Sequence, residues 1–278
     1  MKLKYLGTAA SEAIPALFCQ CDVCRKAREK GGRHIRSRSQ ALVDDSLLID
    51  FPCDTCWHMV QNGLSLLDFN HCLITHVHDD HFSPEQIAYI RRGYASVLPE
   101  NYGGFHIYGS EDIAAPLDSI LQSAPDRLFC HPVEPYAPFM AGDYRVTALK
   151  ARHGTPHPYN YLIERDGKAL LYAHDTGHFF PEAWDYLASH PVHIGLVSFD
   201  CTFANSTRGD APRTGHMGMG DNILMRDKLF SLGLADANTR FVLNHFSHNG
   251  PDVDYDAFCA MAEKEGFAVS YDGMELIF

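Results

Sequence analysis

Three histidines and two aspartates lie in one run of six residues, His76-Val77-His78-Asp79-Asp80-His81. A β-type segment precedes the run, and Ser83-Pro84, a helix-start pattern, follows it, so we expect a loop between a strand and a helix. Burying so many imidazoles and carboxylates together without a cation would cost a large desolvation energy. The run therefore predicts a metal site, and it requires a fold that brings further ligands to this loop.

The spacing within the run favours two metals over one. His76 and His78 are two residues apart in extended backbone and project to one side, whereas Asp80 and His81 turn toward another point as the helix begins. Each metal needs more ligands than the loop provides, so further ligands must come from elsewhere in the chain.

Short β-type runs alternate with segments of helical spacing, which predicts an α/β protein. His76, His153, Asp175 and His245 each follow such a β-type run, and residues at strand ends share one rim of a sheet. We expect the last three to complete the ligand sets, with the Asp175 carboxylate as the bridge. The predicted strands are 2–6, 46–50, 71–74, 144–150, 159–164, 169–172, 194–200, 240–244 and 268–271, and the predicted helices begin at Ser83 or span 112–122, 181–189, 222–232 and 255–264.

A second cluster, Cys19-Gln20-Cys21-Asp22-Val23-Cys24, has the spacing of three zinc thiolates in a loop. His248, three residues after His245, is our candidate for the fourth ligand of a structural zinc site. The alternative is three incidental buried cysteines. A second pair, Cys53 and Cys56, has no partner pair, and we interpret these two as packing cysteines.

The His76–His81 run and the downstream ligands resemble the metallo-β-lactamase superfamily, whose pattern is His-x-His-x-Asp-His. The resemblance covers residues 2–278 and implies one domain with a four-layered αββα sandwich. It places His76, His78 and His153 on one metal, Asp80, His81 and His245 on the other, and Asp175 between them. It also implies that Asp50 orients ligands from beneath the site.

Within this superfamily the chain is similar to the phosphoribosyl cyclic phosphate phosphodiesterases of the carbon-phosphorus lyase pathway, a branch with a zinc loop, here at about 15–40. The matching stretches are 6–8, Pro15, 210–213 with the following His216, 245–248 and 271–275, whereas Ala9 and Ala13 stand where the branch often has Gly. The resemblance implies a binuclear phosphodiesterase acting on a small cyclic phosphate such as phosphoribosyl 1,2-cyclic phosphate.

For this chemistry, two cations about 3.5 to 4 Å apart would activate water for in-line attack on the phosphodiester. We expect His216 to protonate the leaving alkoxide, and we count Asp80 as catalytic as well as a ligand. Nitrogen and carboxylate ligands suit manganese, zinc or iron in the catalytic pair, whereas the thiolates favour zinc in the other site. Arg208 and Arg213 could hold a phosphate or be ordinary surface residues.

The balance of acidic and basic residues limits the binding partners that the protein can have. Acidic residues outnumber basic ones 35 to 23, for a formal net charge of -12, which argues against a nucleic-acid surface but leaves a small anionic phosphodiester open. The sequence shows neither a signal peptide nor an apolar run of about 20 residues, so we expect a cytoplasmic protein without a membrane partner. A homodimer is compatible with the sequence.

Two other functions remain open. A hydrolase of the same fold could act on a thioester, a lactone or a β-lactam, and a protein of this fold could bind metal without catalysis. A full set of seven ligands together with a candidate acid speaks against the non-catalytic alternative.

Overall fold

The computed structural model describes residues 1–205, 215–250 and 253–278, which form two seven-stranded sheets. The first sheet has the order β14 (Glu275–Ile277), β1 (Lys2–Gly7), β2 (Gln40–Val43), β3 (Leu47–Ile49), β4 (His71–Leu73), β5 (Phe105–Gly109) and β6 (Leu128–Pro132). The second has the order β13 (Ala268–Val269), β12 (Arg240–Asn244), β11 (Leu196–Asp200), β10 (Lys168–Ala173), β9 (Tyr159–Arg165), β8 (Tyr144–Lys150) and β7 (Phe139–Ala141).

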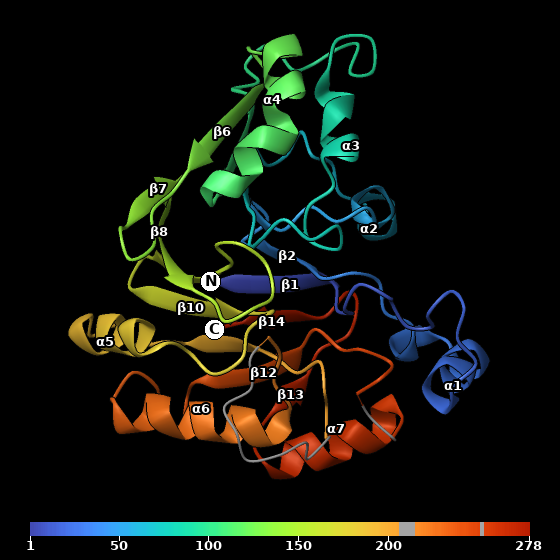
Figure 1. Ribbon diagram of the computed structural model, residues 1–278, viewed down its shortest axis with the longest axis vertical. Coiled ribbons are helices and arrows are strands. Elements are labelled where there is room, and N and C mark those ends of the chain that lie inside the picture. The colour runs from blue at the N-terminus through green and yellow to red at the C-terminus, as the bar shows by residue number, and fades with distance from the viewer. Residues whose placement is uncertain (206–214, 251–252) are drawn as a thin grey trace.

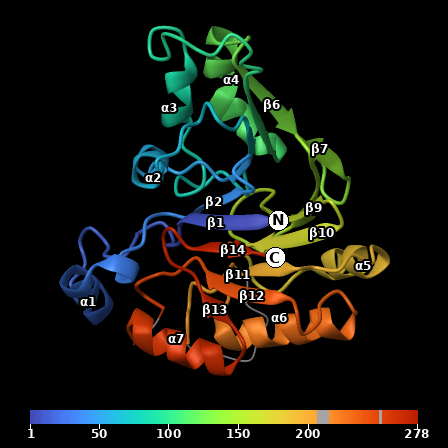
Figure 2. The same cartoon turned by 180° about the vertical axis from the view of Figure 1, so that it is seen from behind.

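The two sheets pack face to face, and helices cover both outer faces (Figure 1). Over the first sheet lie α2 (Thr55–Asn62), α3 (Pro84–Ile87) and α4 (Ala114–Ser123), and over the second lie α5 (Pro181–Ser189), α6 (Met219–Ser231) and α7 (Tyr255–Lys264). Figure 2 shows the same four layers from behind, with α1 (Asp22–Lys30) apart from them at one side. The fold is therefore the αββα sandwich expected from the sequence.

Alternation along the strands explains the layers. In β3, Leu47 and Ile49 face the core between the sheets, whereas Leu48 faces the helices of the first outer layer. In β10, Leu170 and Tyr172 face the same inter-sheet core, and Leu171 faces the other helix layer. Strands buried on both faces are apolar throughout, which is why these runs were recognisable in the sequence.

The strand ends gather at one rim. β3 and β4 run parallel, as do β10, β11 and β12, so their carboxyl ends share an edge within each sheet. The two edges meet where the backbone N–H of Tyr159 donates to the carbonyl of Thr75 at 2.8 Å. Three residues at this rim adopt positive φ angles, Asp50, Asp175 and His245, a conformation that costs energy and that concentrates at functional sites.

Most predicted elements are confirmed within two or three residues, including the last strand, of which β13 keeps two residues. The helix after Ser83 begins where expected, with Ser83 at the N-cap position and Pro84 as its first residue, but it is short and continues only as a 3-10 turn (Ala88–Ile90). The Ser83 side chain makes no capping hydrogen bond and donates to Glu85. One expectation was wrong: Cys24 lies inside α1 with Cys21 as its N-cap residue, so the cysteine cluster is not wholly in a loop.

Among the described residues, seven α-helices and strands were not predicted: α1, α2, β2, β5, β6, β7 and β14. Among the helices of the described residues, none combines the length and apolar character needed to cross a membrane.

Candidate metal centre

The first predicted ligand set converges. The ring atoms of His76, His78 and His153 and a carboxylate oxygen of Asp175 all lie within 4.8 Å of one another. The Nδ1 atom of His78 is 3.0 Å from Nε2 of His76 and 3.1 Å from Nε2 of His153. Four ligand atoms from three separate segments, at the ends of β4, β8 and β10, thus face one point.

The second predicted set converges beside it. Asp80, His81, Asp175 and His245 bring ligand atoms within 4.8 Å of one another, and Asp175 belongs to both sets. The Nε2 atom of His81 lies 2.8 Å from Oδ2 of Asp175 and 3.2 Å from Nε2 of His245. The same Oδ2 is 3.2 Å from Nε2 of His76. Asp175 therefore stands where a bridging carboxylate would be.

Hydrogen bonds on the far sides of the rings orient these nitrogens. His81 Nδ1 donates to Asp50 Oδ2 at 2.7 Å, and Asp50 also accepts from the backbone N–H and the hydroxyl of Thr75. The Thr75 hydroxyl lies 3.0 Å from Nδ1 of His76, and Nδ1 of His153 donates to the carbonyl of Gly215 at 3.1 Å. Nδ1 of each of these rings thereby faces away from the centre, and Nε2 faces it, as expected for metal-ligating histidines.

The charge states also suit cation binding. Burial alone would raise the pKa of Asp175, but His245 and His81 lower it well below its usual value, so this carboxylate is ionised. Burial lowers the pKa of His76 to about 3 and also lowers that of His153, so both imidazoles are neutral at pH 7. Ionised carboxylates and neutral imidazoles are the forms that ligate metals. At His81 the carboxylates of Asp80, Asp50 and Asp175 outweigh burial and raise the pKa well above its usual value, so this ring would release a proton when it binds a metal.

The donor set fits a pair of divalent ions. Ligand atoms bound about 2.0 to 2.1 Å from one ion lie about 2.9 to 3.4 Å apart. The separations of 3.0, 3.1 and 3.2 Å between ring nitrogens fall in this range. Oδ1 of Asp175 is buried and makes no hydrogen bond, although it lies 3.1 Å from Nδ1 of His245 and 3.3 Å from Nδ1 of His216. Lone pairs facing one another at these distances repel unless a proton or a metal cation lies between them.

His216 lies next to this centre, held by Asp200, an aspartate that was not among the predicted site residues. Its Nδ1 atom is 3.0 Å from Oδ2 of Asp200 and 3.3 Å from Oδ1 of Asp175. Burial lowers the pKa of His216, but the carboxylates of Asp200 and Asp175 outweigh it and raise the pKa to about 9. Asp200 also accepts from the backbone N–H of Met217. The position of Asp200 at the end of a predicted strand was the available signal.

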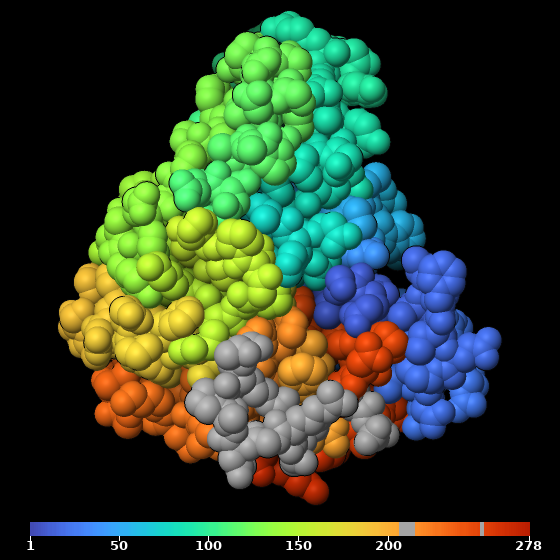
Figure 3. Space-filling view, in the orientation of Figure 1, coloured from blue at the N-terminus to red at the C-terminus, as the bar shows by residue number. Residues whose placement is uncertain are grey.

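The centre opens into a pocket of about 340 Å³. Figure 3 shows N-terminal, central and C-terminal segments, coloured blue, teal to yellow-green and orange to red, meeting on one face of the molecule. The pocket is lined by residues from all of these parts: Ala10, Ser11, Glu12, His78, Asp80, His153, Asp175, Thr202, Phe203, His216, His245, Ser247 and Asn249. A second pocket, of about 510 Å³, shares His153 with it. A small substrate can therefore reach both ligand sets from solvent.

The cysteine cluster forms a separate candidate site. The sulfurs of Cys19, Cys21 and Cys24 and a ring nitrogen of His248 lie within 4.8 Å of one another. The Cys21 sulfur is 3.5 Å from Nδ1 of His248, the separation of about 3.5 Å that tetrahedral zinc gives a sulfur and a nitrogen ligand. Backbone N–H groups donate to sulfur at Cys19 and Cys24, as expected where thiolates ligate a metal.

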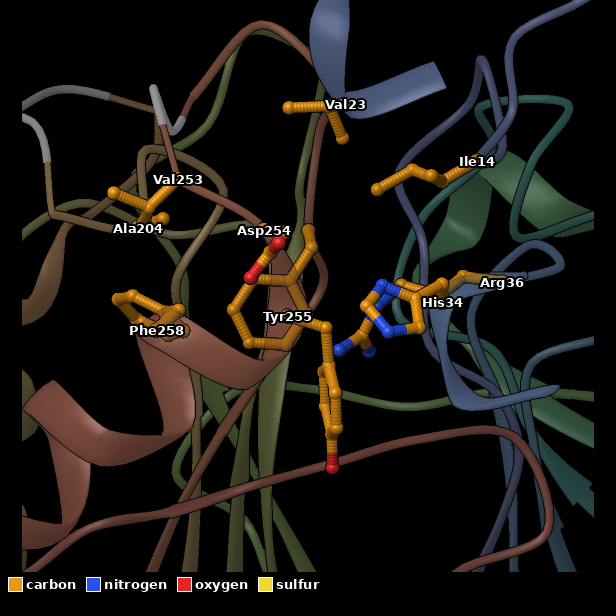
Figure 4. A pocket seen from close by; sticks show the side chains of 10 residues that line it. Ile14, Val23, His34, Arg36, Ala204, Val253, Asp254, Tyr255 and Phe258 are labelled. Carbon is orange, nitrogen blue, oxygen red and sulfur yellow. The ribbon is translucent and has the colours of Figure 1, made fainter. Parts of the chain in front are cut away.

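Packing beneath this cluster joins the N-terminal segment to α7. Ile14 and Val23 meet Tyr255 and Phe258 around a small cavity of about 40 Å³ (Figure 4). The guanidinium of the buried Arg36 lies 5.1 Å from the centroid of the Tyr255 ring. The cluster and this contact hold the first and last parts of the chain together.

Other predicted positions fall elsewhere. Cys53 and Cys56 are both exposed, so their interpretation as packing cysteines was wrong. Of the remaining histidines near the ligands, His174 is fully buried and bonds to the hydroxyl of Ser198, whereas the half-exposed His157 pairs with Asp112. Arg208, Arg213 and the stretch 210–213 lie outside the described residues.

Comparison with known proteins gives a family and a fold. A family model described as the beta-lactamase superfamily domain matches residues 52–246. Among solved structures, zinc-bound PqqB from Methylobacterium extorquens is 20% identical, with full coverage of both chains and a TM-score of 0.76. A diphosphatase from the PhnP family is 17% identical, and the match covers 100% of this chain and 96% of the diphosphatase, with a TM-score of 0.73. The short form of human tRNase Z is also 17% identical, and the match covers 100% of this chain and 99% of the tRNase, with a TM-score of 0.63. No curated protein matches the sequence.

Proposed function

Because the chain belongs to the metallo-β-lactamase superfamily, we propose that it is a binuclear-metal phosphodiesterase that hydrolyses a small cyclic phosphate, such as phosphoribosyl 1,2-cyclic phosphate. One observation carries the proposal: two ligand sets share Asp175, and a histidine paired with an aspartate lies next to them in one pocket. The solved structures named above include a diphosphatase and a tRNase, which agrees with this reaction class.

In this proposal His76, His78 and His153 hold one divalent ion, Asp80, His81 and His245 hold the other, and Asp175 holds both. Manganese, zinc and iron all suit these ligands. When bound, the two ions supply the positive charge that makes a water molecule acidic and stabilises a phosphoryl group under attack. Cys19, Cys21, Cys24 and His248 hold a structural zinc within the loop 15–40 of a single domain.

His216 supplies the proton for the leaving alkoxide. With a pKa raised to about 9, by carboxylates that outweigh the effect of burial, the imidazole is protonated at pH 7. Asp200 holds Nδ1, so the other ring nitrogen is left to donate to a substrate oxygen in the pocket. The hydroxyl of Thr202 lies 2.9 Å from Nδ1 of His245 and 3.1 Å from Nδ1 of His216. It therefore fixes the positions of the two rings relative to each other. A positioned acid of this kind contributes about 10²- to 10⁴-fold to a rate.

The test is a substrate panel with metal-loaded protein. We expect turnover of a five-membered cyclic phosphate with manganese or zinc, and none of a β-lactam. Loss of turnover in His78→Ala, with unchanged turnover in the exposed control His193→Ala, ties the activity to the centre. Turnover of a thioester, lactone or β-lactam alone would support a different hydrolase. A metal-loaded protein inert toward all of these compounds would support the non-catalytic alternative.

A further inference from the structure

A carboxylate that belongs to neither ligand set reaches the catalytic pocket. Glu12 lies in the segment that follows β1, and it lines the pocket together with His78, Asp80 and His216. Its side chain is 35% exposed. An acidic group is unexpected where a phosphodiester anion binds, because like charges repel. The metal chemistry alone gives Glu12 no role at this position.

Two hydrogen bonds fix this carboxylate. The hydroxyl of Ser247 and the side-chain amide of Asn249 each donate to Oε1 of Glu12 at 3.1 Å. Nε2 of His248, a residue of the candidate zinc site, lies 3.9 Å from the same oxygen. All three partners belong to the segment after the metal-ligand candidate His245. The carboxylate is thus held in one place relative to the catalytic centre, and both bonds use Oε1, which leaves Oε2 for a ligand.

A fixed carboxylate oxygen selects among substrates. It accepts hydrogen bonds but donates none, so it binds a hydroxyl group and repels a phosphate. A hydrogen bond from a neutral donor to a charged group contributes more than one between neutral groups. We infer that Glu12 binds a hydroxyl of the substrate's alcohol part, so that the preferred substrate is a sugar or polyol phosphodiester with a free hydroxyl at this position. This inference rests on the proposed function and narrows its substrate class.

In a purely structural role, Glu12 would only hold its own segment against the segment that contains Ser247 and Asn249. The Glu12→Gln substitution separates the two roles. The glutamine carbonyl can accept from Ser247 and Asn249 as Oε1 does now, which preserves both hydrogen bonds between the two segments. Its NH₂ group then takes the place of Oε2, so an acceptor becomes a donor. A structural role alone predicts little change, whereas substrate recognition predicts that the preference for the substrate with the free hydroxyl is lost.

The experiment compares phosphoribosyl 1,2-cyclic phosphate, whose 3-hydroxyl is free, with its 3-deoxy analogue. Wild type should favour the compound with the free hydroxyl in kcat/KM. In Glu12→Gln the KM for that compound should rise about tenfold, the loss expected for a hydrogen bond to a charged group, while the KM for the 3-deoxy analogue stays the same. Glu29→Gln, on the exposed surface of α1, is the matched control and should leave both values unchanged.

Equal kcat/KM of wild type for the two compounds, or an equal ratio of the two values in wild type and Glu12→Gln, would overturn the inference. If wild type hydrolyses neither compound, the proposed function fails, and calorimetric binding of the same two compounds to the metal-loaded proteins then decides the role of Glu12. A difference in affinity that Glu12→Gln abolishes would support this role, and equal affinities in wild type would refute it.

Discussion

Nδ1 of His216 lies 3.0 Å from Oδ2 of Asp200, the last residue of β11. This contact joins the end of a strand of the second sheet to the segment that begins at residue 215. His216 also lies 3.3 Å from Asp175, the carboxylate that belongs to both ligand sets. A charged carboxylate behind an imidazole keeps that imidazole protonated, which suits a general acid.

The pair predicts a dependence on the leaving group. His216→Ala should lower kcat about 10²- to 10⁴-fold for a phosphodiester with an alkoxide leaving group, because the alkoxide needs a proton. With a p-nitrophenolate leaving group, which departs without protonation, the loss should be small. Steady-state kinetics on both substrates measure the difference, and equal losses would argue against an acid at this position.

The same pair predicts a pH effect. The acid form of His216, with its pKa of about 9, is lost as the pH rises through that value, so kcat should fall on the alkaline side. Asp200→Asn removes the carboxylate that contributes most to raising this pKa, so the alkaline limb should move to lower pH. A pH profile of kcat tests this shift. An alkaline limb that stays in place in Asp200→Asn would contradict the assignment.

Asp50 should control metal affinity without contacting the metals. Because Asp50 accepts from His81 Nδ1 at 2.7 Å, Asp50→Asn should weaken binding at the site that His81 serves by about 10- to 100-fold. Calorimetric titration of the metal-free protein with manganese measures this change. Asp118→Asn, on the exposed face of α4, is the control, and equal affinities in the two variants would show that Asp50 has no such role.

Removing one thiolate of the cysteine cluster should lower the stability of the protein more than its catalytic activity. Cys21→Ser should lose one zinc per chain and about 2 kcal/mol of stability, or about 4 to 8 °C in Tm for a chain of this size. The exposed Cys56→Ser should change neither quantity. Elemental analysis with thermal unfolding measures both, and an unchanged zinc content in Cys21→Ser would leave the cluster as ordinary cysteines.

A buried histidine away from the metals predicts acid sensitivity. His58 bonds to Gln40 and Ser37, and burial lowers its pKa to about 4. A folded pKa below the unfolded value of about 6.5 contributes stability above pH 6.5, and this stability is lost as the pH falls toward 4. The loss should reach about 3 kcal/mol at pH 4. Urea unfolding of metal-free wild type and His58→Gln should differ in pH dependence over this window, and parallel curves would refute the assignment.

Much of the site was predictable because its residues are marked by local patterns. A dense ligand run and three polar residues directly after apolar strands identify positions along the chain, and parallel strands bring such positions to one edge. The seven ligand candidates therefore came from sequence alone. The four layers came from the resemblance to the superfamily, and the apolar strands agree with them.

The rest depends on contacts between distant segments. Glu12 meets Ser247, 235 residues away, and nothing near Glu12 in the sequence marks that contact. A single aspartate at a strand end is common in proteins whatever its role, so the sequence did not distinguish Asp200. The exposure of Cys53 and Cys56 depends on where α2 lies on the sheet, which Cys-x-x-Cys spacing does not encode. Short strands such as β7 and β14 form through pairing with neighbours, so their own sequences carry little signal.

The central claim is that residues from position 76 to 245 converge on a pair of cations. This pair is separate from the zinc ion proposed for the cysteine cluster. Metal content per chain, measured on protein purified and reloaded under one condition, tests it most directly. We predict three ions in wild type, two in Cys21→Ser, and one, the cysteine-bound zinc, in Asp175→Ala, which loses the ligand that both catalytic ions share. Three ions in Asp175→Ala, or a single ion in wild type, would contradict the claim.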